Sequence, residues 1–116
     1  MKFTHQNIDG IFIFRFLERK LDTSNSGLLK GEFSSFVKSE KVTKLVIDLT
    51  EIEHCDSSGL STLLVVNRIM QEKEGILRLV PSSKILQLCQ ITKLDRVLSI
   101  ASTIDEAVLE LRKIEA

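Results

Sequence analysis

The amino-acid sequence predicts an α/β fold: a mixed, mostly parallel β-sheet with an N-terminal hairpin, packed against about four helices. Short apolar runs, typical of strands covered on both faces, alternate along the chain with segments whose apolar residues recur at helical spacing. Such alternation favours parallel strands joined by helical crossovers. Asp9-Gly10 is a two-residue turn pattern, and it predicts that the first two strands pair antiparallel at one edge of the sheet.

In the first half of the chain the pattern predicts three strands and one helix. The strands are a half-polar segment over Lys2–Asn7 and two apolar runs, Ile11–Leu17 and Lys44–Leu49. Between these two runs, apolar residues recur at helical spacing over Leu29–Val37, which predicts a helix with a narrow apolar face. The segment Leu21–Asn25 precedes this helix and is rich in residues that cap helices.

The longest predicted helix follows a polar loop after the strand Lys44–Leu49. The run Ser57–Gly59 opens this helix, and Gly75 ends it, as glycine does at many helix C-termini. The apolar run Ile76–Val80 then predicts a strand, which Pro81 stops because proline has no N–H to pair. The apolar face of the long helix consists of Leu60, Leu63, Leu64, Val66 and Met70.

The C-terminal part of the chain predicts a short helix, a short strand and a last helix. Ser82 or Ser83 caps the short helix, and Val97–Ile100 predicts an edge strand. The run Thr103–Glu106 has the pattern of a capping box, in which a Thr and a Glu side chain satisfy backbone amides at a helix start. The apolar face of the last helix consists of Ile104, Ala107, Val108, Leu111 and Ile114.

Composition and charge exclude several classes of protein. The chain has 116 residues, which predicts a single domain over residues 1–116. Lys plus Arg and Asp plus Glu both total 16, so the basic surplus typical of nucleic-acid and anionic-membrane binding is missing. No apolar stretch reaches the roughly 18 residues of a membrane span. Cys55 and Cys89 are too few for a disulfide framework and predict reduced thiols in the cytoplasm. We therefore expect no nucleic-acid and no membrane partner.

The loop Thr50–Asp56 and the two serines after it form the densest polar group in the chain. A serine nucleophile at a strand-to-helix turn would need the pattern G-x-S-x-G, which does not surround Ser57. The single glycines form no phosphate-binding loop, and we expect no enzymatic activity, no cofactor and no metal site. No established metal-ligand spacing links the remaining polar residues of the loop, namely Glu51, Glu53, His54 and Cys55.

Asp48 stands at the end of a predicted strand, as the phosphorylated aspartate of a receiver domain does. That chemistry also needs an acidic cluster at the end of the first strand to hold a divalent cation. The corresponding segment here is Phe16–Arg19, which has one carboxylate. We therefore interpret Asp48 as a structural residue that bonds the backbone at the end of its strand.

The run Asp56–Gly59 allows two interpretations. In the first, Asp and Ser side chains only cap the free N–H groups of a helix start. In the second, a serine of this run is a regulatory phosphosite, since the N–H groups and dipole of a helix N-terminus accept a phosphate. In either case Gly59 allows close approach of another backbone, from this chain or from a partner.

The stretch Val46–Leu60 resembles the signature of STAS domains, the family of bacterial anti-sigma factor antagonists. That signature is an apolar strand, a short acidic and polar loop, and D-S-S-G-L at the start of a helix. The resemblance covers essentially the whole chain. The hairpin, Leu21-Asp22 before the first helix, Pro81 after a strand and Ile91–Leu94 before the last strand all follow in the same order.

The resemblance implies a partner switch controlled by phosphorylation. In this family an unphosphorylated antagonist binds an anti-sigma factor and frees the sigma factor. The anti-sigma factor is also a serine kinase that phosphorylates and so releases the antagonist, and a serine phosphatase resets the cycle. The phosphoacceptor follows the Asp of the motif, which makes it Ser57 here, with Ser58 as the secondary candidate. Asp22 matches a residue that lies near the phosphosite in the family.

We expect the partner-binding face where the loops after adjacent parallel strands meet. Arg19 stands where the family usually has Gly, which leaves the shape of its loop and the identity of the partner open. The alternative function is a constitutive STAS binding subunit of a transport or signalling complex, in which Ser57 is only a helix cap. The predicted face consists of Asp22, Thr23, Asp56, Ser57, Ser58, Gly59 and Thr62.

Overall fold

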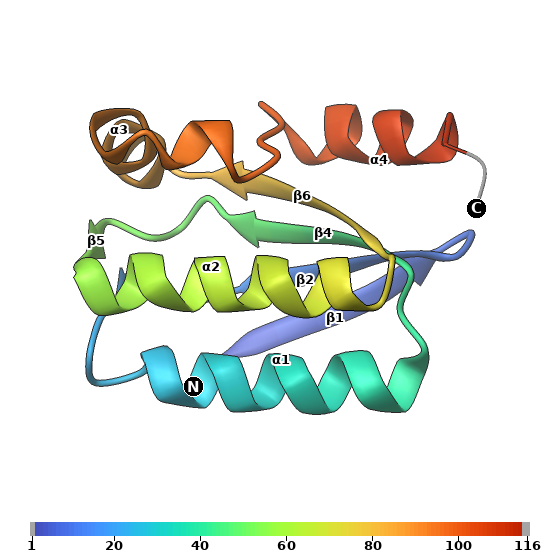
Figure 1. Ribbon diagram of the computed structural model, residues 1–116, viewed down its shortest axis with the longest axis horizontal. Helices are drawn as coiled ribbons and strands as arrows, with labels where there is room; N and C mark the ends of the chain where they lie inside the picture. The colour runs from blue at the N-terminus through green and yellow to red at the C-terminus, as the bar shows by residue number, and fades with distance from the viewer. Residues whose placement is uncertain (1, 115–116) are drawn as a thin grey trace.

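A four-stranded mixed sheet forms the centre of the protein in the computed structural model, which describes residues 2–114 (Figure 1). Its strands lie in the order β1 (Phe3–Ile8), β2 (Ile11–Phe16), β4 (Lys44–Leu49) and β6 (Ile76–Pro81). β1 pairs antiparallel with β2, and the other neighbours pair parallel. The predicted hairpin and the mostly parallel sheet are confirmed. Both residues of the Asp9-Gly10 turn have positive φ, at 53° and 85°, as a two-residue hairpin turn requires.

Helices cover the two faces of this sheet in unequal numbers. The helices α1 (Ser26–Glu40) and α2 (Ser57–Glu72) lie side by side on one face, and α4 (Ile104–Arg112) lies on the other (Figure 1). The helix α3 (Ser83–Thr92) packs against β6 and against residues 54–55. A 3-10 turn, η1 (Leu94–Arg96), follows α3 and also packs against it. The four predicted helices are therefore present.

Alternation along the strands builds a separate core on each face. In β2, Phe14 and Phe16 enter the core under α1 and α2, whereas Ile11 and Ile13 enter the core under α4. The same alternation in β4 sends Leu45 to the first core and Val46 to the second. This two-sided burial explains why these strands read as continuous apolar runs.

A second, two-stranded parallel sheet joins the loop after β2 to the loop before α2. It consists of β3 (Lys20–Leu21) and β5 (His54–Cys55). The backbone carbonyl of Arg19 accepts from the amides of Glu53 at 2.6 Å and His54 at 3.1 Å, and that of Leu21 accepts from Asp56 at 3.3 Å. The sequence pattern did not predict these strands, because two residues are too few to show alternation.

The prediction of an edge strand over Val97–Ile100 is wrong. Ile100 alone forms an isolated parallel bridge, in which the amide of Leu79 donates to Ser99 and the amide of Ala101 donates to Leu79. The amides of Val97 and Leu98 instead donate to the carbonyl of Leu94, so the turn takes the donors that a strand would need.

The role predicted for Gly75 also needs correction. The helix α2 ends at Glu72, and the residue with left-handed backbone is Glu74, at φ 58°. Gly75 instead lies in a tight space, since a Cβ there would lie 3.1 Å from the carbonyl oxygen of Thr43 and 2.7 Å from Cε of Met70, the mobile end of a flexible side chain.

The start of α2 lies directly against the small sheet. A Cβ on Gly59 would lie 2.4 Å from the carbonyl oxygen of Leu21 and 2.7 Å from Sγ of Cys55. Gly59 is buried, so the close approach that its missing side chain permits is to this chain's own backbone. The described part of the chain contains no helix that is both long and apolar enough to cross a membrane.

We predict that Gly59→Ala lowers the free energy of unfolding by about 2–3 kcal/mol, because the methyl group meets a backbone oxygen that cannot move without shifting β3. Gly31→Ala is the matched control, because Gly31 is an exposed helical glycine with nothing within 4 Å of a built Cβ. We expect Gly31→Ala to raise stability by up to about 1 kcal/mol. Urea denaturation at neutral pH measures both, and equal effects of the two substitutions would contradict the packing argument.

Candidate functional site

The candidate site lies at the end of the sheet where β2 and β4 finish, which is also where α1 and α2 begin (Figure 1). Ligands and partners of parallel sheets commonly bind at this end. The small β3–β5 sheet brings together its two loops, residues 17–25 and residues 50–56. The geometry of the site therefore depends on these two loops and on the first turn of α2.

The loop before α1 is held by its own side chains. Oδ1 of Asp22 accepts from the amide of Ser24 at 2.9 Å and from its hydroxyl at 2.5 Å. The side chain of Asn25 accepts from the amide of Asp22 at 3.0 Å and donates to the carbonyl of Lys20 at 2.8 Å. The hydrogen bonds from Ser24, its hydroxyl first, lower the pKa of Asp22. The Asp22 carboxylate is therefore ionised at neutral pH, with Thr23 exposed beside it.

Asp56 is the N-cap of α2. Its Oδ1 accepts from the amide of Gly59 at 3.0 Å and from the hydroxyl of Ser58 at 2.6 Å. The Ser58 hydroxyl, followed by the Gly59 amide, lowers the pKa of Asp56, and the amide of Thr23 acts in the same direction. An ionised carboxylate thus accepts a hydrogen bond from a free amide at the start of α2 and another from the hydroxyl of Ser58.

Ser57 is the first residue of α2, as predicted, and its side chain is exposed. Within residues 2–114 its hydroxyl makes no hydrogen bond, whereas the hydroxyl of Ser58 donates to Asp56. The cap interpretation of this run therefore applies to Asp56, not to Ser57. Of the two candidate phosphoacceptors, Ser57 has the hydroxyl that a second protein can reach without breaking a bond in the fold.

The structure brings four of the predicted face residues together at the surface and places two beneath it. Asp22 and Asp56 lie close enough for their charges to interact, with Thr23 and Ser57 beside them. Thr62 is 5% exposed, and its hydroxyl donates to the carbonyl of Ser26 at 3.4 Å, joining α2 to α1. Gly59 is also buried, so these two residues shape the site from below. The partly buried Ser58 completes the set.

The sequence analysis interpreted Ser24 and Asn25 only as helix-capping residues, whereas in the structure they hold the shape of the first loop. Asn25 is the N-cap position of α1, but its side chain makes no cap bond to the helix. The pattern D-x-S-N, in which short polar side chains bond neighbouring backbone groups, could have identified them. Arg19 has no left-handed backbone, and its carbonyl accepts from the amides of Glu53 and His54, so this position does not require glycine here.

The other polar residues near the site have structural surroundings. Asp48 accepts from the amide and hydroxyl of Thr50 at 2.9 and 2.7 Å and forms an ion pair with Arg15 at 3.6 Å, which agrees with its structural interpretation. Burial, followed by the charge of Asp56, raises the pKa of the Cys55 thiol to about 11. His54 is exposed. Among residues 2–114, no three His, Cys, Asp or Glu side chains gather closely enough to hold a metal ion.

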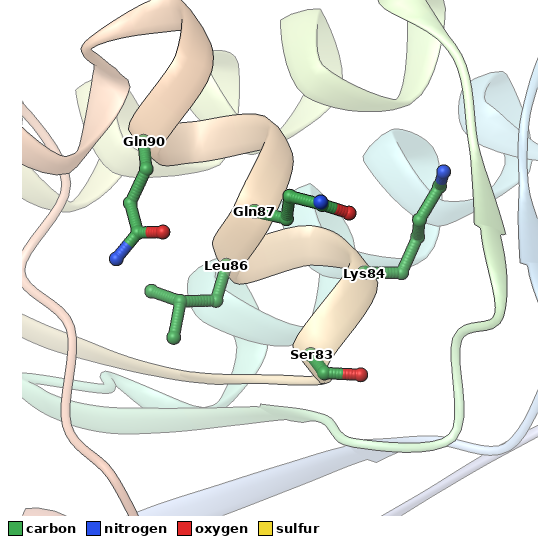
Figure 2. Close-up of a pocket in the computed structure, with 5 residues that line it drawn as sticks. All are labelled: Ser83, Lys84, Leu86, Gln87 and Gln90. Atoms are coloured by element: carbon green, nitrogen blue, oxygen red, sulfur yellow. The ribbon is translucent and has the colours of Figure 1, made fainter.

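A hollow of about 410 Å³ lies on the surface of α3 (Figure 2), and Ser57 is not among its lining residues. All of its lining residues belong to that one helix, so no second element contributes a converging group. We therefore do not place the candidate site there. The lining consists of Ser83, Lys84, Leu86, Gln87 and Gln90.

Known proteins resemble this chain over nearly its whole length. The model of the STAS domain family matches residues 2–107. A Thermotoga maritima protein named as an anti-sigma factor antagonist is 26% identical to this chain over 112 residues. The alignment covers 96% of this chain and 98% of that protein. A crystal structure of a Thermotoga maritima protein, also named as an anti-sigma factor antagonist, superposes on this chain with a TM-score of 0.82 and 26% sequence identity. The match covers 96% of this chain and 95% of the crystallised chain.

Two further sets of solved structures share the fold at lower identity. An anti-sigma factor antagonist from Mycobacterium paratuberculosis is 21% identical and has a TM-score of 0.84, over 97% of this chain and 94% of its own. The Bacillus protein SpoIIAA is 21% identical in its unphosphorylated and phosphorylated forms, with TM-scores of 0.71 and 0.70. These match 97% and 96% of this chain, and 100% of SpoIIAA in both forms.

We predict that Asp56→Ala lowers the free energy of unfolding by about 1 kcal/mol, since it removes the cap of α2. Ser57→Ala should change stability by less than about 0.5 kcal/mol, because the exposed hydroxyl makes no bond within the described residues. Urea denaturation at pH 7 compares the two variants. A loss in Ser57→Ala as large as that in Asp56→Ala would identify Ser57 as the cap and contradict this geometry.

We also predict slow alkylation of Cys55 in the folded protein. With a pKa of about 11, only roughly a thousandth of the thiol is ionised at pH 8, and the thiolate is the reactive form. The rate with iodoacetamide should rise steadily as the pH increases toward 11, whereas the urea-unfolded chain should react like an ordinary thiol. Peptide mapping separates Cys55 from Cys89. Fast modification of folded Cys55 at pH 8 would contradict the raised pKa.

Proposed function

The chain belongs to the STAS domain family, and we propose that it acts in the cytoplasm as an anti-sigma factor antagonist. In this proposal it binds an anti-sigma factor that has serine kinase activity, and phosphorylation of Ser57 releases it. The observation that carries the proposal is the exposed hydroxyl of Ser57 at the start of α2, directly after the N-cap Asp56; this hydroxyl makes no hydrogen bond to any residue that the structure describes. The names of the related proteins support the same role.

Charge accounts for the proposed release. A phosphate adds about 1.5–2 negative charges at neutral pH. It would stand next to two carboxylates, Asp56 and Asp22, whose pKa values are both lowered, so the end of the domain would become strongly acidic. The amide of Gly59 is already bonded to Asp56, and the Ser57 hydroxyl makes no hydrogen bond within residues 2–114. Phosphorylation would therefore change what a partner meets at this surface while leaving α2 and its core contacts in place.

The proposed contact is transient and reset by a serine phosphatase. Its surface is made of two polar loops and the first turn of α2, and such polar faces suit complexes of modest area. In the alternative function, a constitutive binding subunit, Ser57 would serve only as a cap. That task belongs to Asp56, which favours the phosphorylated switch over this alternative.

We predict opposite effects of two substitutions at Ser57 on binding to the anti-sigma factor kinase. Ser57→Ala should bind persistently in the presence of ATP, because it cannot be phosphorylated. Ser57→Glu should bind at least about tenfold more weakly, which corresponds to roughly 1.4 kcal/mol. Ser35→Glu adds the same charge on the exposed outer side of α1 and serves as the control. Calorimetry with the purified kinase measures each affinity.

Intact-mass analysis of protein purified from its native host tests the modification itself. We expect one added phosphate that maps to Ser57 and persists in Ser58→Ala. Wild-type affinity in both Ser57 variants, or a phosphate on Ser58 alone, would contradict the proposed switch.

A further inference from the structure

The face of the sheet opposite α1 and α2 is only partly covered. Helix α4 packs on β2, β4 and β6 on this face (Figure 1). A groove lies between α4 and the β1–β2 hairpin. Cross-strand pairing places Gln6 opposite Ile13 and Ile8 opposite Ile11 on this side. The groove has a volume of about 410 Å³. One charged residue of the sheet, Arg15, also lines it, and the guanidinium of Arg15 forms an ion pair with Asp48 at 3.6 Å. The apolar wall of the groove consists of Ile8, Ile13, Ile104, Val108 and Leu109.

One side of α4 borders this groove and forms a stripe with a negative charge at its N-terminal end and a positive charge at its C-terminal end. Asp105 and Arg112 are seven residues apart, which is two helical turns, and both line the groove together with Val108 and Leu109 between them. Leu109 is 55% exposed, although it is a large apolar residue. The stripe therefore runs from negative through apolar to positive along one side of the helix.

We infer that this face binds a second copy of the same chain, with the two α4 helices antiparallel across a two-fold axis near Val108 and Leu109. A two-fold interface is self-complementary, so residue i of one chain meets residue j of the other and the reverse. Antiparallel pairing of the stripe sets Asp105 of each chain opposite Arg112 of the other, with Leu109 of each chain entering the partner's groove. A partner with a single sign of charge would meet repulsion at one end of the stripe.

The pairing would also complete the architecture of each subunit. The face with α1 and α2 has two helices, whereas the opposite face has one. The second copy's α4 would add cover over Ile8, which is only partly buried, whereas Ile13 beside it is already buried. Arg112 already pairs with Asp9 at 3.3 Å, but both groups are largely exposed and one guanidinium nitrogen makes this contact, so other donors remain for the partner chain.

The surface used for self-association lies across the sheet from α2. The two Ser57 sites of the pair would therefore stay exposed, so this inference does not rest on the proposed function. The failure of either can be recognised without the other, because the test below involves no kinase and no phosphate.

Charge-swap variants test the pairing by sedimentation velocity over a series of protein concentrations up to roughly 1 mM. Wild-type protein should shift from one chain to two as concentration rises. Asp105→Arg and Arg112→Asp should each weaken association at least tenfold, because like charges then face each other. The double variant should restore it to within about threefold, and an equimolar mixture of the two single variants should form the mixed dimer.

Thermal unfolding separates an effect on association from an effect on the stability of the single chain. Each reversal places a charge at the unfavourable end of α4, so thermal unfolding is recorded for all variants, with Asp105→Asn and Arg112→Gln as milder substitutions. Leu109→Ser should weaken association, while Leu28→Ser, at a residue 57% exposed on α1, should leave it unchanged. A wild-type chain that stays monomeric, reversals without effect, or equal effects of the two leucine substitutions would overturn the inference.

Discussion

The N-cap interaction of Asp56 is the contact on which the candidate site depends. Its carboxylate bonds the amide of Gly59 and the hydroxyl of Ser58, so it begins α2 and leaves Ser57 outside the network. The arrangement needs a glycine at position 59, because the first turn lies against the carbonyl of Leu21. The cap, the close packing contact and the exposed hydroxyl thus meet within one turn of the helix.

The sheet separates two surfaces with different physical character. On the side of α1 and α2, the site is polar and acidic, which suits control by an added phosphate. On the side of α4, the groove is apolar between charges of opposite sign, which suits self-association. Because a packed core lies between them on each face of the sheet, a change of charge at Ser57 need not disturb the surface on α4.

Most of the fold could be predicted because it depends on local patterns. The buried strands, the Asp9-Gly10 turn and the helix periods are each encoded within a few residues. The error at Val97–Ile100 has a tertiary cause: a β-rich tetrapeptide forms a strand only if its backbone donors are free, and here Leu94 takes two of them. The sheet formed by β3 and β5 could not be predicted either, because its pairing joins residues 34 positions apart through backbone groups alone.

By itself the sequence determined the α/β class, the family resemblance and the position of Ser57 at a helix start, because capping and periodicity act between near neighbours. Only the tertiary structure decided which side chains of the motif face outward. It assigned the cap to Asp56, turned Thr62 and Gly59 inward, and placed Asp22 beside Asp56. The physical reason is that burial and the meeting of separate loops depend on how helices pack on the sheet, which no local pattern records.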